Sequence, residues 1–508
     1  MLCASIAVIN LTRPPRLTPF QMSKDTILTH RGYSILKSDV DAATTKRIVE
    51  DLTVCPKLNK KFASAGAQAE LTFKLFKESG SRWYLPRAYG TEMFGEPASS
   101  VLSEGLGISA TAAEFKGTPY PYQTEIIDSF LAAGSNGLIC VPCGKGKTFM
   151  ALKIAAMLGK RFMVIVDKEF LMNQWRGEMA VLMPGLRVGI LQGPKCETDP
   201  ADYDCTICMI QTLCGKDVDE QIFRSFGFTI FDECHHLAAQ HFSKTLFKVQ
   251  TKYMLGLSAT PTREDGLTKV FFWFLGKPVY WEKQREPDPT VEVVSVLVKS
   301  DEVEYNTVPT DWRGETVMAR LLTNILGCKE RTAEIVRRIV ELCSNPDRRV
   351  LVLSERIGHL NEIERLISEK SELTMSYYIG GMKEAKREAG AATARILLAS
   401  YAMASEAMNI KTLNTVVLAS PRKHVEQSTG RILRVRPSER TVVPLIVDIV
   451  DAHSMYKGQW KKRMTYYRAC AYSLRTEGMG SVGTVLGVPV ASEAIRVVPG
   501  KAMFISAM

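Results

Sequence analysis

The stretch from Leu138 to Met150 reads L-I-C-V-P-C-G-K-G-K-T-F-M, and the interpretation of the whole chain starts from it. Its apolar beginning predicts a buried strand, and residues 149–158 carry the apolar face of a helix. A glycine loop between strand and helix lets backbone N–H groups turn toward phosphate oxygens, while a lysine reaches the β- and γ-phosphates and a hydroxyl holds Mg²⁺. The nucleotide-binding residues predicted here are Pro142, Cys143, Gly144, Lys145, Gly146, Lys147 and Thr148.

This stretch departs from the pattern G-x-x-x-x-G-K-[ST] at one position, because Val141 stands where the first glycine is expected. A chance Gly-Lys-Thr in a turn is the alternative interpretation. The surrounding strand and helix favour the phosphate loop, so we expect ATP with Mg²⁺ as the ligand.

The bulk composition is that of a large, basic, globular protein. The chain has 508 residues, enough for about three domains, and 46% of them are hydrophobic. Its net charge of +11 and isoelectric point near 9.0 favour a polyanionic partner such as nucleic acid, although a merely basic protein would have the same values. No apolar stretch reaches the length of a membrane span, so no membrane partner is expected.

The 12 cysteines are scattered without a secretory pattern, which predicts reduced thiols in a soluble, intracellular protein. Two C-x-x-C pairs suggest zinc at first sight. However, Cys140 and Cys143 overlap the phosphate loop, and Cys205 and Cys208 lie in an apolar run, so zinc is not predicted. The first residues are expected to form a flexible leader, with Met22 as an alternative start.

The order of apolar and amphipathic segments predicts an α/β protein with two similar lobes. Strands and helices alternate around the phosphate loop, as in a parallel sheet, and a second alternating run follows without a phosphate loop. Its last strand is expected at Leu445–Ile449. The predicted parts are an α+β N-terminal accessory domain with leader (1–112), a first lobe (113–286), a linker (287–330), a second lobe (331–477) and a tail (478–508).

Within the N-terminal part, residues 38–52 have helical spacing, and residues 71–76 and 82–89 are expected as strands or loops. Residues 97–107 are predicted to be a linker. The aromatic and basic residues of this part could face DNA, but a structural role fits them equally well.

Paired carboxylates follow the predicted strand 228–231. Asp232 is expected to hold Mg²⁺, and Glu233 to orient and deprotonate the attacking water. The alternative is an acidic loop that caps a helix. Upstream of the phosphate loop, the amide of Gln123 is suited to pairing with adenine.

Two further clusters come later in the chain. Ser258 and Thr260 offer hydroxyls after a predicted strand, and the triplet Arg263–Glu264–Asp265 follows them, where charge pattern alone favours a solvated turn. In the second lobe, Arg431 and Arg434 are three residues apart and are expected to share a helix face, as arginine fingers or as a surface basic helix.

In this order, the segments P-Y-Q, P-C-G-K-G-K-T, D-E-C-H, S-A-T and Q-x-x-G-R-x-x-R resemble the motifs of superfamily 2 helicases, over about residues 115–450. The stretches P-C-G-K-G-K-T and L-G-L-S-A-T-P-T-R-E-D resemble the XPB-like branch. The segments G-Y-S-I-L-K and Y-L-P-R-A-Y-G resemble the leader domain of XPB-like helicases of large DNA viruses, a group that includes the poxvirus transcript-release helicase.

The resemblance implies two tandem RecA-like lobes, ATP between them, and 3′-to-5′ movement along nucleic acid. It implies coupling roles for His235, Ser258, Ala259 and Thr260 and strand-opening roles for Arg263, Glu264 and Asp265. It implies that Gln427, Arg431 and Arg434 complete the catalytic set of Lys147, Asp232 and Glu233. One departure is Asn409, where the family prefers an aspartate that contacts ribose, so a weaker ribose contact is expected.

The function expected from these features is an ATP-dependent DNA helicase or translocase in viral transcription or DNA repair. If the protein is viral, as the resemblance suggests, it would act in the host cytoplasm or nucleus. Packaging in the virion and a partner in the transcription machinery are further options. The alternatives are a duplex translocase that does not unwind, an RNA helicase, and an ATP-dependent assembly factor.

Overall fold

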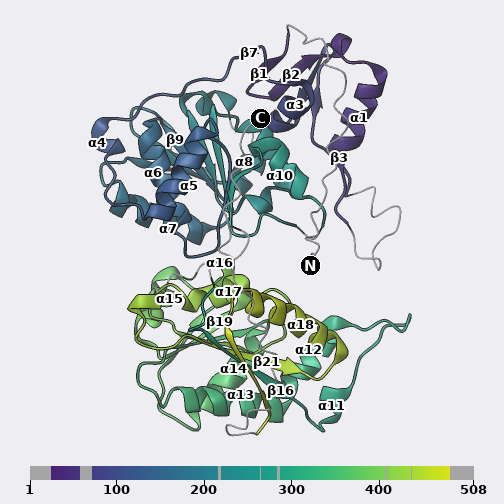
Figure 1. The fold of residues 1–508 in the computed structure, drawn as a ribbon, viewed down its shortest axis with the longest axis vertical. Helices are drawn as coiled ribbons and strands as arrows, with labels where there is room; N and C mark the ends of the chain where they lie inside the picture. Colours follow the sequence, from purple (N-terminus) through teal and green to yellow (C-terminus); the bar gives the residue numbers. More distant parts are fainter. Residues whose placement is uncertain are drawn as a thin grey trace, which may run out of the picture. The chain divides into compact units, whose positions relative to one another are not determined.

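The computed structural model describes residues 25–57, 71–215, 219–238, 240–263, 265–282, 287–406, 408, 410–435 and 437–480. The expected leader, the alternative start at Met22, Glu264, Asn409 and nearly all of the expected tail lie outside these residues. The described chain divides into two compact units (Figure 1). The first holds the residues up to Ile139 together with Met150–Asp167 and Arg176–Val279, and the second holds Cys140–Phe149, Lys168–Trp175 and the residues from Tyr280 onward.

The N-terminal domain is a small α+β fold within the first unit. Its sheet has the order β5-β6-β2-β1-β7, in which β1 and β7 are parallel and the other neighbours antiparallel. The strands are β1 (Ile27–Thr29), β2 (Gly32–Leu36), β5 (Lys77–Glu78), β6 (Arg82–Leu85) and β7 (Ser99–Ser100), with a separate ladder of β3 (Thr53–Val54) and β4 (Phe73–Lys74). The helices are α1 (Ala42–Leu52) and α3 (Arg87–Phe94).

Three local expectations for this domain need correction. The expected helix 38–52 begins later, because the Asp41 side chain accepts from the Thr44 N–H and caps α1. Residues from Arg87 onward form a helix rather than a strand or loop, since Pro86 stands at its N-cap. The expected linker 97–107 contributes β7 to the sheet.

The first lobe is a parallel α/β sheet with the order β11-β10-β12-β9-β13-β14-β8-β15, edged by the antiparallel β11. Its strands are β8 (Asn136–Cys140), β9 (Phe162–Val166), β10 (Val188–Gln192), β11 (Lys195–Cys196), β12 (Cys205–Met209), β13 (Phe228–Phe231), β14 (Tyr253–Ser258) and β15 (Pro278–Trp281). Its helices are α4 (Ala110–Ala113), α5 (Pro121–Ala132), α6 (Lys147–Leu158), α7 (Glu169–Leu182), α8 (Ile210–Gly215), α9 (Gln240–Lys248) and α10 (Thr268–Leu275). The apolar runs found in the sequence are its central strands: β9, β12 and β13 are buried at every residue, as expected for strands covered on both faces.

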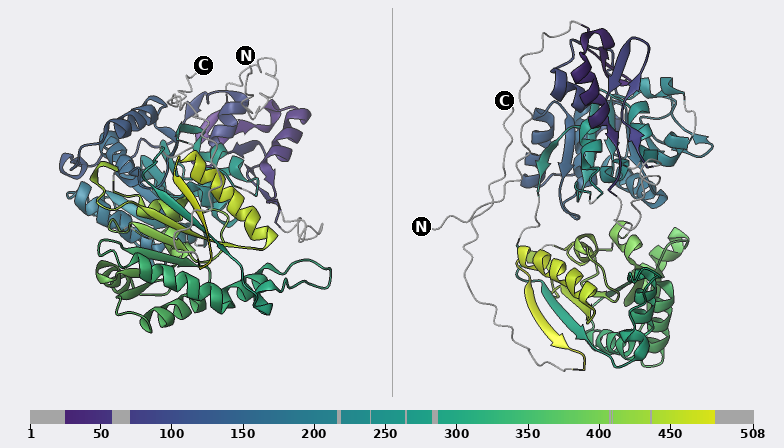
Figure 2. Two further views of the ribbon diagram at one scale, coloured as in Figure 1. Left: turned by 60° about the horizontal axis from the view of Figure 1, so that its bottom comes forward. Right: turned by 90° about the vertical axis from the view of Figure 1, so that its right-hand side faces the viewer.

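The second lobe has a parallel sheet with the order β18-β19-β17-β20-β21-β16-β22. Its strands are β16 (Glu292–Val298), β17 (Val350–Ser354), β18 (Met375–Tyr378), β19 (Ile396–Ser400), β20 (Thr415–Leu418), β21 (Leu445–Asp451) and β22 (Ser473–Gly478). Its helices are α11 (Val303–Asn306), α12 (Met318–Gly327), α13 (Lys329–Leu342), α14 (Ile357–Ser368), α15 (Glu384–Thr393), α16 (Tyr401–Glu406), α17 (Glu426–Thr429) and α18 (Ser454–Ala469). Figure 2 shows α18, in yellow, on the opposite side of this sheet from the dark green helices.

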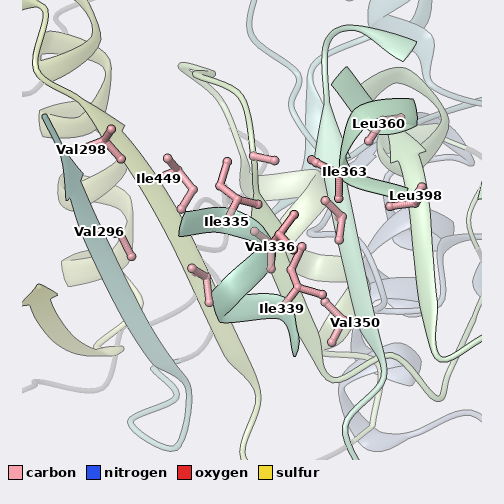
Figure 3. Packing of buried hydrophobic residues seen from close by; sticks show 14 of the residues in the cluster. Val296, Val298, Ile335, Val336, Ile339, Val350, Leu360, Ile363, Leu398 and Ile449 are labelled. Carbon is pink, nitrogen blue, oxygen red and sulfur yellow. The ribbon is translucent and has the colours of Figure 1, made fainter. Parts of the chain in front are cut away.

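Two expectations for the second lobe were wrong. Residues 292–298, expected in the linker, form β16, because their β-branched run alternates between two cores. Leu445–Ile449 does not end the sheet, since β22 follows and pairs with β16. Figure 3 shows one of these cores, where Val296 and Val298 lie in the same layer as Ile335 and Ile339 of α13.

The described parts of the chain therefore have the expected fold class: two α/β units with parallel sheets flanked by helices, RecA-like in arrangement, and a smaller α+β domain at the start.

Candidate functional site

Three neighbouring strands of the first lobe carry the main sequence motifs at their carboxyl ends. The strands β13, β14 and β8 are consecutive in the sheet, and β13 and β14 run parallel. The Met254 N–H donates to the Ser135 carbonyl at 3.3 Å, so β8 and β14 begin side by side. The glycine loop, the carboxylate pair and the S-A-T segment thus follow adjacent strands, at the edge where open α/β sheets bind ligands.

The loop after β8 has the backbone freedom that phosphate binding requires. Gly144 and Gly146 have φ angles of 90° and 81°, which side-chain-bearing residues rarely adopt. Lys147 and Thr148 open α6, so the partial positive charge of a 12-residue helix lies at this loop. The Lys145 ammonium lies 3.2 Å from a Glu282 carboxylate oxygen, and this pair is largely buried.

The turn after β13 holds the two carboxylates in a constrained backbone. The Asp232 N–H donates to the Ile165 carbonyl at 3.0 Å, and the Asp232 carboxylate accepts from the Glu233 N–H at 3.0 Å. Glu233 has a φ angle of 42°, which disfavours a residue with a side chain by about 1–3 kcal/mol. Such strain persists where the surrounding contacts fix the backbone, and it clusters at functional sites.

His235 connects this turn to the end of β14. Its Nδ1 lies 3.1 Å from the Ser258 hydroxyl and 3.4 Å from a Glu233 carboxylate oxygen. The Ser258 hydroxyl also accepts from the Thr260 N–H at 3.2 Å, and Ser258 is fully buried. His235 therefore contacts the carboxylate pair and is hydrogen-bonded to the S-A-T segment, where Ala259 links Ser258 to Thr260.

A second path leaves the same turn through residues that the motifs did not point to. His236 Nδ1 lies 2.7 Å from an Asp167 carboxylate oxygen, and the Asp167 carbonyl accepts from the Gln211 side chain at 2.7 Å. Asp167 follows β9 directly, and its place at the carboxyl end of a central strand is the signal that could have identified it.

Arg263 and Asp265, the two described residues of the charge triplet, are held by hydrogen bonds and are largely buried. The Arg263 guanidinium donates to the Asp265 carboxylate through two nitrogens and to the His235 carbonyl at 2.6 Å. The exposed fractions of these two side chains are 21% and 25%. Burial alone would raise the pKa of Asp265, but hydrogen bonds from the Arg263 side chain and the Leu267 N–H outweigh it and lower that pKa.

Gln123 is in the first turn of α5 and is buried, with 4% of its surface exposed. Its side-chain oxygen accepts from the Tyr120 N–H at 3.0 Å and so caps the helix. The adenine-reading role remains a prediction.

In the second lobe, Arg431 and Arg434 do not share a helix face as expected. Gln427 lies in α17, which ends at Thr429, and Arg431 lies in a 3₁₀ turn that stops at Ile432. The two arginines nevertheless meet at one acceptor, since both donate to the Met408 carbonyl, at 2.8 and 2.7 Å.

Arg431 is buried and also donates to the Ala404 carbonyl, so it is not part of a surface basic helix.

Among the helices of the described residues, none combines the length and the apolar character that a transmembrane span requires.

Comparison with protein families and curated proteins gives consistent matches. Residues 116–263 match the family described as Type III restriction enzyme, res subunit. The chain is 31% identical over 459 residues to "Putative ATP-dependent RNA helicase L396" of Acanthamoeba polyphaga mimivirus, covering 89% of this chain and 86% of the relative. It is 28% identical to "Putative ATP-dependent RNA helicase QP509L" of African swine fever virus (strain Badajoz 1971 Vero-adapted), covering 70% of this chain and 74% of the relative.

A third relative is "Putative helicase 055L" of Frog virus 3, at 25% identity and with coverage of 78% and 86%. Among solved structures, the match to T4 UvsW covers 87% of this chain and 97% of that chain, with 16% identity and a TM-score of 0.33. The extent of the mimivirus match, together with the helicase motifs at the carboxyl ends of adjacent strands, shows that this chain belongs to the superfamily 2 ATP-dependent helicases represented by these viral proteins.

Proposed function

We propose that this chain is a DNA helicase or translocase of the XPB-like branch, which hydrolyses ATP to move along nucleic acid and separate strands. The observation that carries the proposal is the path of contacts from Glu233 to His235, at 3.4 Å, and from His235 to Ser258, at 3.1 Å. Coupling hydrolysis to movement requires such a path, because it connects the turn that holds Asp232 and Glu233, called the hydrolytic turn below, to a segment outside the nucleotide site.

The residues of the first lobe divide the hydrolytic work. Lys147 binds the β- and γ-phosphates, and the backbone around Gly144 and Gly146 holds the phosphate oxygens. Thr148 and Asp232 offer a hydroxyl and a carboxylate, which are the hard oxygen ligands that suit Mg²⁺. When bound there, Mg²⁺ neutralises charge on the phosphates. Glu233 orients the attacking water and accepts its proton.

Gln123 is assigned to adenine recognition, and Pro142, Cys143 and Lys145 to the phosphate loop. In the second lobe, Arg431 and Arg434 are assigned to stabilising charge on the transferred phosphoryl group, with Gln427 beside them in the motif. Guanidinium groups suit this role because they stay charged and are planar. Ser258, Ala259 and Thr260, with His235, couple hydrolysis to movement.

DNA is the proposed substrate because the P-C-G-K-G-K-T and T-R-E-D segments resemble the XPB-like branch, and the net charge of +11 favours a polyanion. RNA is the second candidate, since the mimivirus and African swine fever virus relatives carry RNA helicase in their names. Phosphate contacts along a backbone carry little identity, so the positive net charge favours DNA and RNA alike.

The deciding experiment measures ATP hydrolysis with single-stranded DNA, duplex DNA and RNA at one fixed salt concentration, because salt alone shifts such affinities by orders of magnitude. DNA is expected to stimulate hydrolysis more than RNA. Stronger stimulation by RNA would replace the DNA assignment, and no stimulation by either would favour an assembly factor. A strand-displacement assay beside a triplex-displacement assay then separates unwinding from translocation.

Three substitutions test the site itself. Lys147→Ala should abolish turnover, Glu233→Gln should bind ATP but hydrolyse it far more slowly, and Arg434→Ala should lose turnover while the first lobe still binds nucleotide. Normal hydrolysis by any of these variants would remove that residue from the proposed site.

A further inference from the structure

The backbone of the hydrolytic turn is held from outside the nucleotide motifs. Arg263 donates to the carbonyl of His235 at 2.6 Å, and the His235 ring lies 3.4 Å from the Glu233 carboxylate. Glu233 itself has the strained φ angle of 42°. Arg263 therefore restrains His235, whose ring contacts the Glu233 carboxylate that would activate water.

Arg263 is fixed in turn by its own loop. Its Nε donates to Asp265 at 3.0 Å, a second nitrogen donates to the other oxygen of that carboxylate, and its backbone N–H donates to the Thr268 hydroxyl at 2.8 Å. The Leu267 N–H donates to Asp265 at 3.1 Å. A bidentate pair supported on both sides has little freedom to rotate, so a shift of the Asp265 loop moves Arg263 with it.

The Asp265 loop is in contact with the N-terminal domain. The Lys57 N–H donates to the Asp265 carbonyl at 2.8 Å. Gly266 has a φ angle of 80°, and a Cβ placed on it would lie 3.1 Å from Cε of Lys57, so the Lys57 side chain lies directly over this glycine. Lys57 is close in sequence to β3, which follows α1 without a break.

The same domain is anchored at the amino ends of β8 and β14, opposite the ends that carry the motifs. The partly buried Arg87 guanidinium donates to the Asn136 side chain at 3.1 Å and to the carbonyls of Thr251 and Lys252 at 3.2 and 3.0 Å. Asn136 begins β8, and Thr251 lies just before β14. Tyr89 of α3 also packs edge-on against Trp273 of α10, at 5.5 Å between ring centroids. The N-terminal domain thus has a fixed base, while Lys57 reaches the loop after β14.

We propose that Arg263 and Asp265 are positioning residues through which the N-terminal domain controls ATP hydrolysis, by way of Lys57, Asp265, Arg263 and the His235 carbonyl. The inference rests on the proposed function and adds to it a regulatory role for the N-terminal domain. A nucleic-acid strand that displaces Lys57, while the base of the domain stays fixed, would alter the geometry of the hydrolytic turn. This role differs from strand opening, because the Arg263 guanidinium is engaged by the Asp265 carboxylate and by the His235 carbonyl.

The first test is Arg263→Ala, with steady-state ATP hydrolysis as the readout. Loss of a contact that fixes a reacting group lowers kcat by roughly tenfold to a hundredfold, whereas KM for ATP should stay within about twofold, because Arg263 does not belong to the phosphate loop. Arg263→Lys keeps one donor and should recover part of kcat.

The matched control is Arg187→Ala in the same lobe. Arg187 also forms a bidentate pair, with Asp204 at 2.9 and 2.7 Å, and also donates to a backbone carbonyl. It precedes β10, and Asp204 precedes β12, so this pair lies at the amino ends of the strands, away from the motifs. Arg187→Ala should leave kcat unchanged.

The second test is Gly266→Ala, which forces a methyl group toward Lys57 and should lower kcat without changing KM. Gly134→Ala is its control, because Gly134 has a similar φ angle of 74° but open space around it. Gly134→Ala should keep full kcat.

The inference is overturned if Arg263→Ala and Gly266→Ala hydrolyse ATP like wild type, or if KM rises as much as kcat falls. Wild type and Glu233→Gln are assayed in parallel. If wild type does not hydrolyse ATP, or if Glu233→Gln does so normally, the proposed function fails instead, and the two failures are told apart.

Discussion

Lowering the pH should destabilise the second lobe through His359. This side chain in α14 is 5% exposed, and its Nδ1 lies 3.0 Å from the Ser354 hydroxyl at the end of β17. Burial, and then the charge of the nearby Arg331, lower the pKa of His359 from its ordinary value of 6.5 to about 3. The folded lobe therefore excludes the proton that the unfolded chain accepts.

The sign and size of the effect follow from this shift. Above pH 6.5 the imidazole is neutral in both states and contributes no pH dependence. Below that value the unfolded chain binds a proton that the folded lobe does not, so stability falls by about 1.4 kcal/mol per pH unit until the folded pKa is reached. At pH 4.5 the loss is roughly 3 kcal/mol.

Native-state hydrogen exchange of the β17 amides, compared between wild type and His359→Gln at each pH from 7 to 4.5, isolates this residue. Intrinsic exchange rates are the same for both proteins at one pH, so the ratio of protection gives the difference in opening free energy. We expect this difference to shift in favour of the variant by roughly 3 kcal/mol as the pH falls from 7 to 4.5. His424→Gln, a change at an exposed histidine in the same lobe, controls for loss of an imidazole. A difference that stays constant with pH would refute the reasoning.

Three further predictions concern other parts of the chain. Asp451→Ala leaves the fully buried Arg331 without its carboxylate and should lower the free energy of unfolding of the second lobe by about 3–5 kcal/mol, measured in urea titrations. The control is Glu362→Ala at the exposed pair with Arg365, which should change this free energy by less than about 1 kcal/mol. Arg87→Ala should loosen the N-terminal domain by roughly 1–3 kcal/mol, because three acceptors lose one partly buried donor. Limited proteolysis of wild type and variant would measure this loss. Ser258→Ala removes the hydroxyl that contacts His235 and should lower kcat by about tenfold, while binding of a fluorescent ATP analogue stays unchanged. A variant with full kcat would mean that this contact does not serve hydrolysis.

The sequence predicted the central parts of the fold because burial and periodicity coincide there. Strands β9, β12 and β13 are continuous apolar runs, and the glycine loop and carboxylate pair follow strands as expected. Elements whose existence depends on distant partners were missed. β16 has a strand-like sequence, but it lies in a region otherwise poor in pattern, and its partners β21 and β22 are far along the chain.

The same distinction holds for the site. Asp232, Glu233 and His235 stand in one short motif, so local spacing was enough to select them as candidates, and their roles stay predictions. Asp167 comes near His236 only because β9 and β13 are neighbours in the sheet, which no local pattern reports. The inward orientation of Arg263 and Asp265 was also hidden, since a run of three charges looks the same whether water or a carbonyl group receives its hydrogen bonds.

The position of β16 has a consequence for how the second lobe is assembled. It is the first strand of that sheet to leave the ribosome, yet its two neighbours are the last strands of the same sheet to be made. Until those strands arrive, a run of valines has an unpaired backbone on both sides, which is a hazard for association with other chains. A chain cut short before β22 would therefore leave β16 at the edge of the sheet, with one side of its valine-rich backbone unpaired.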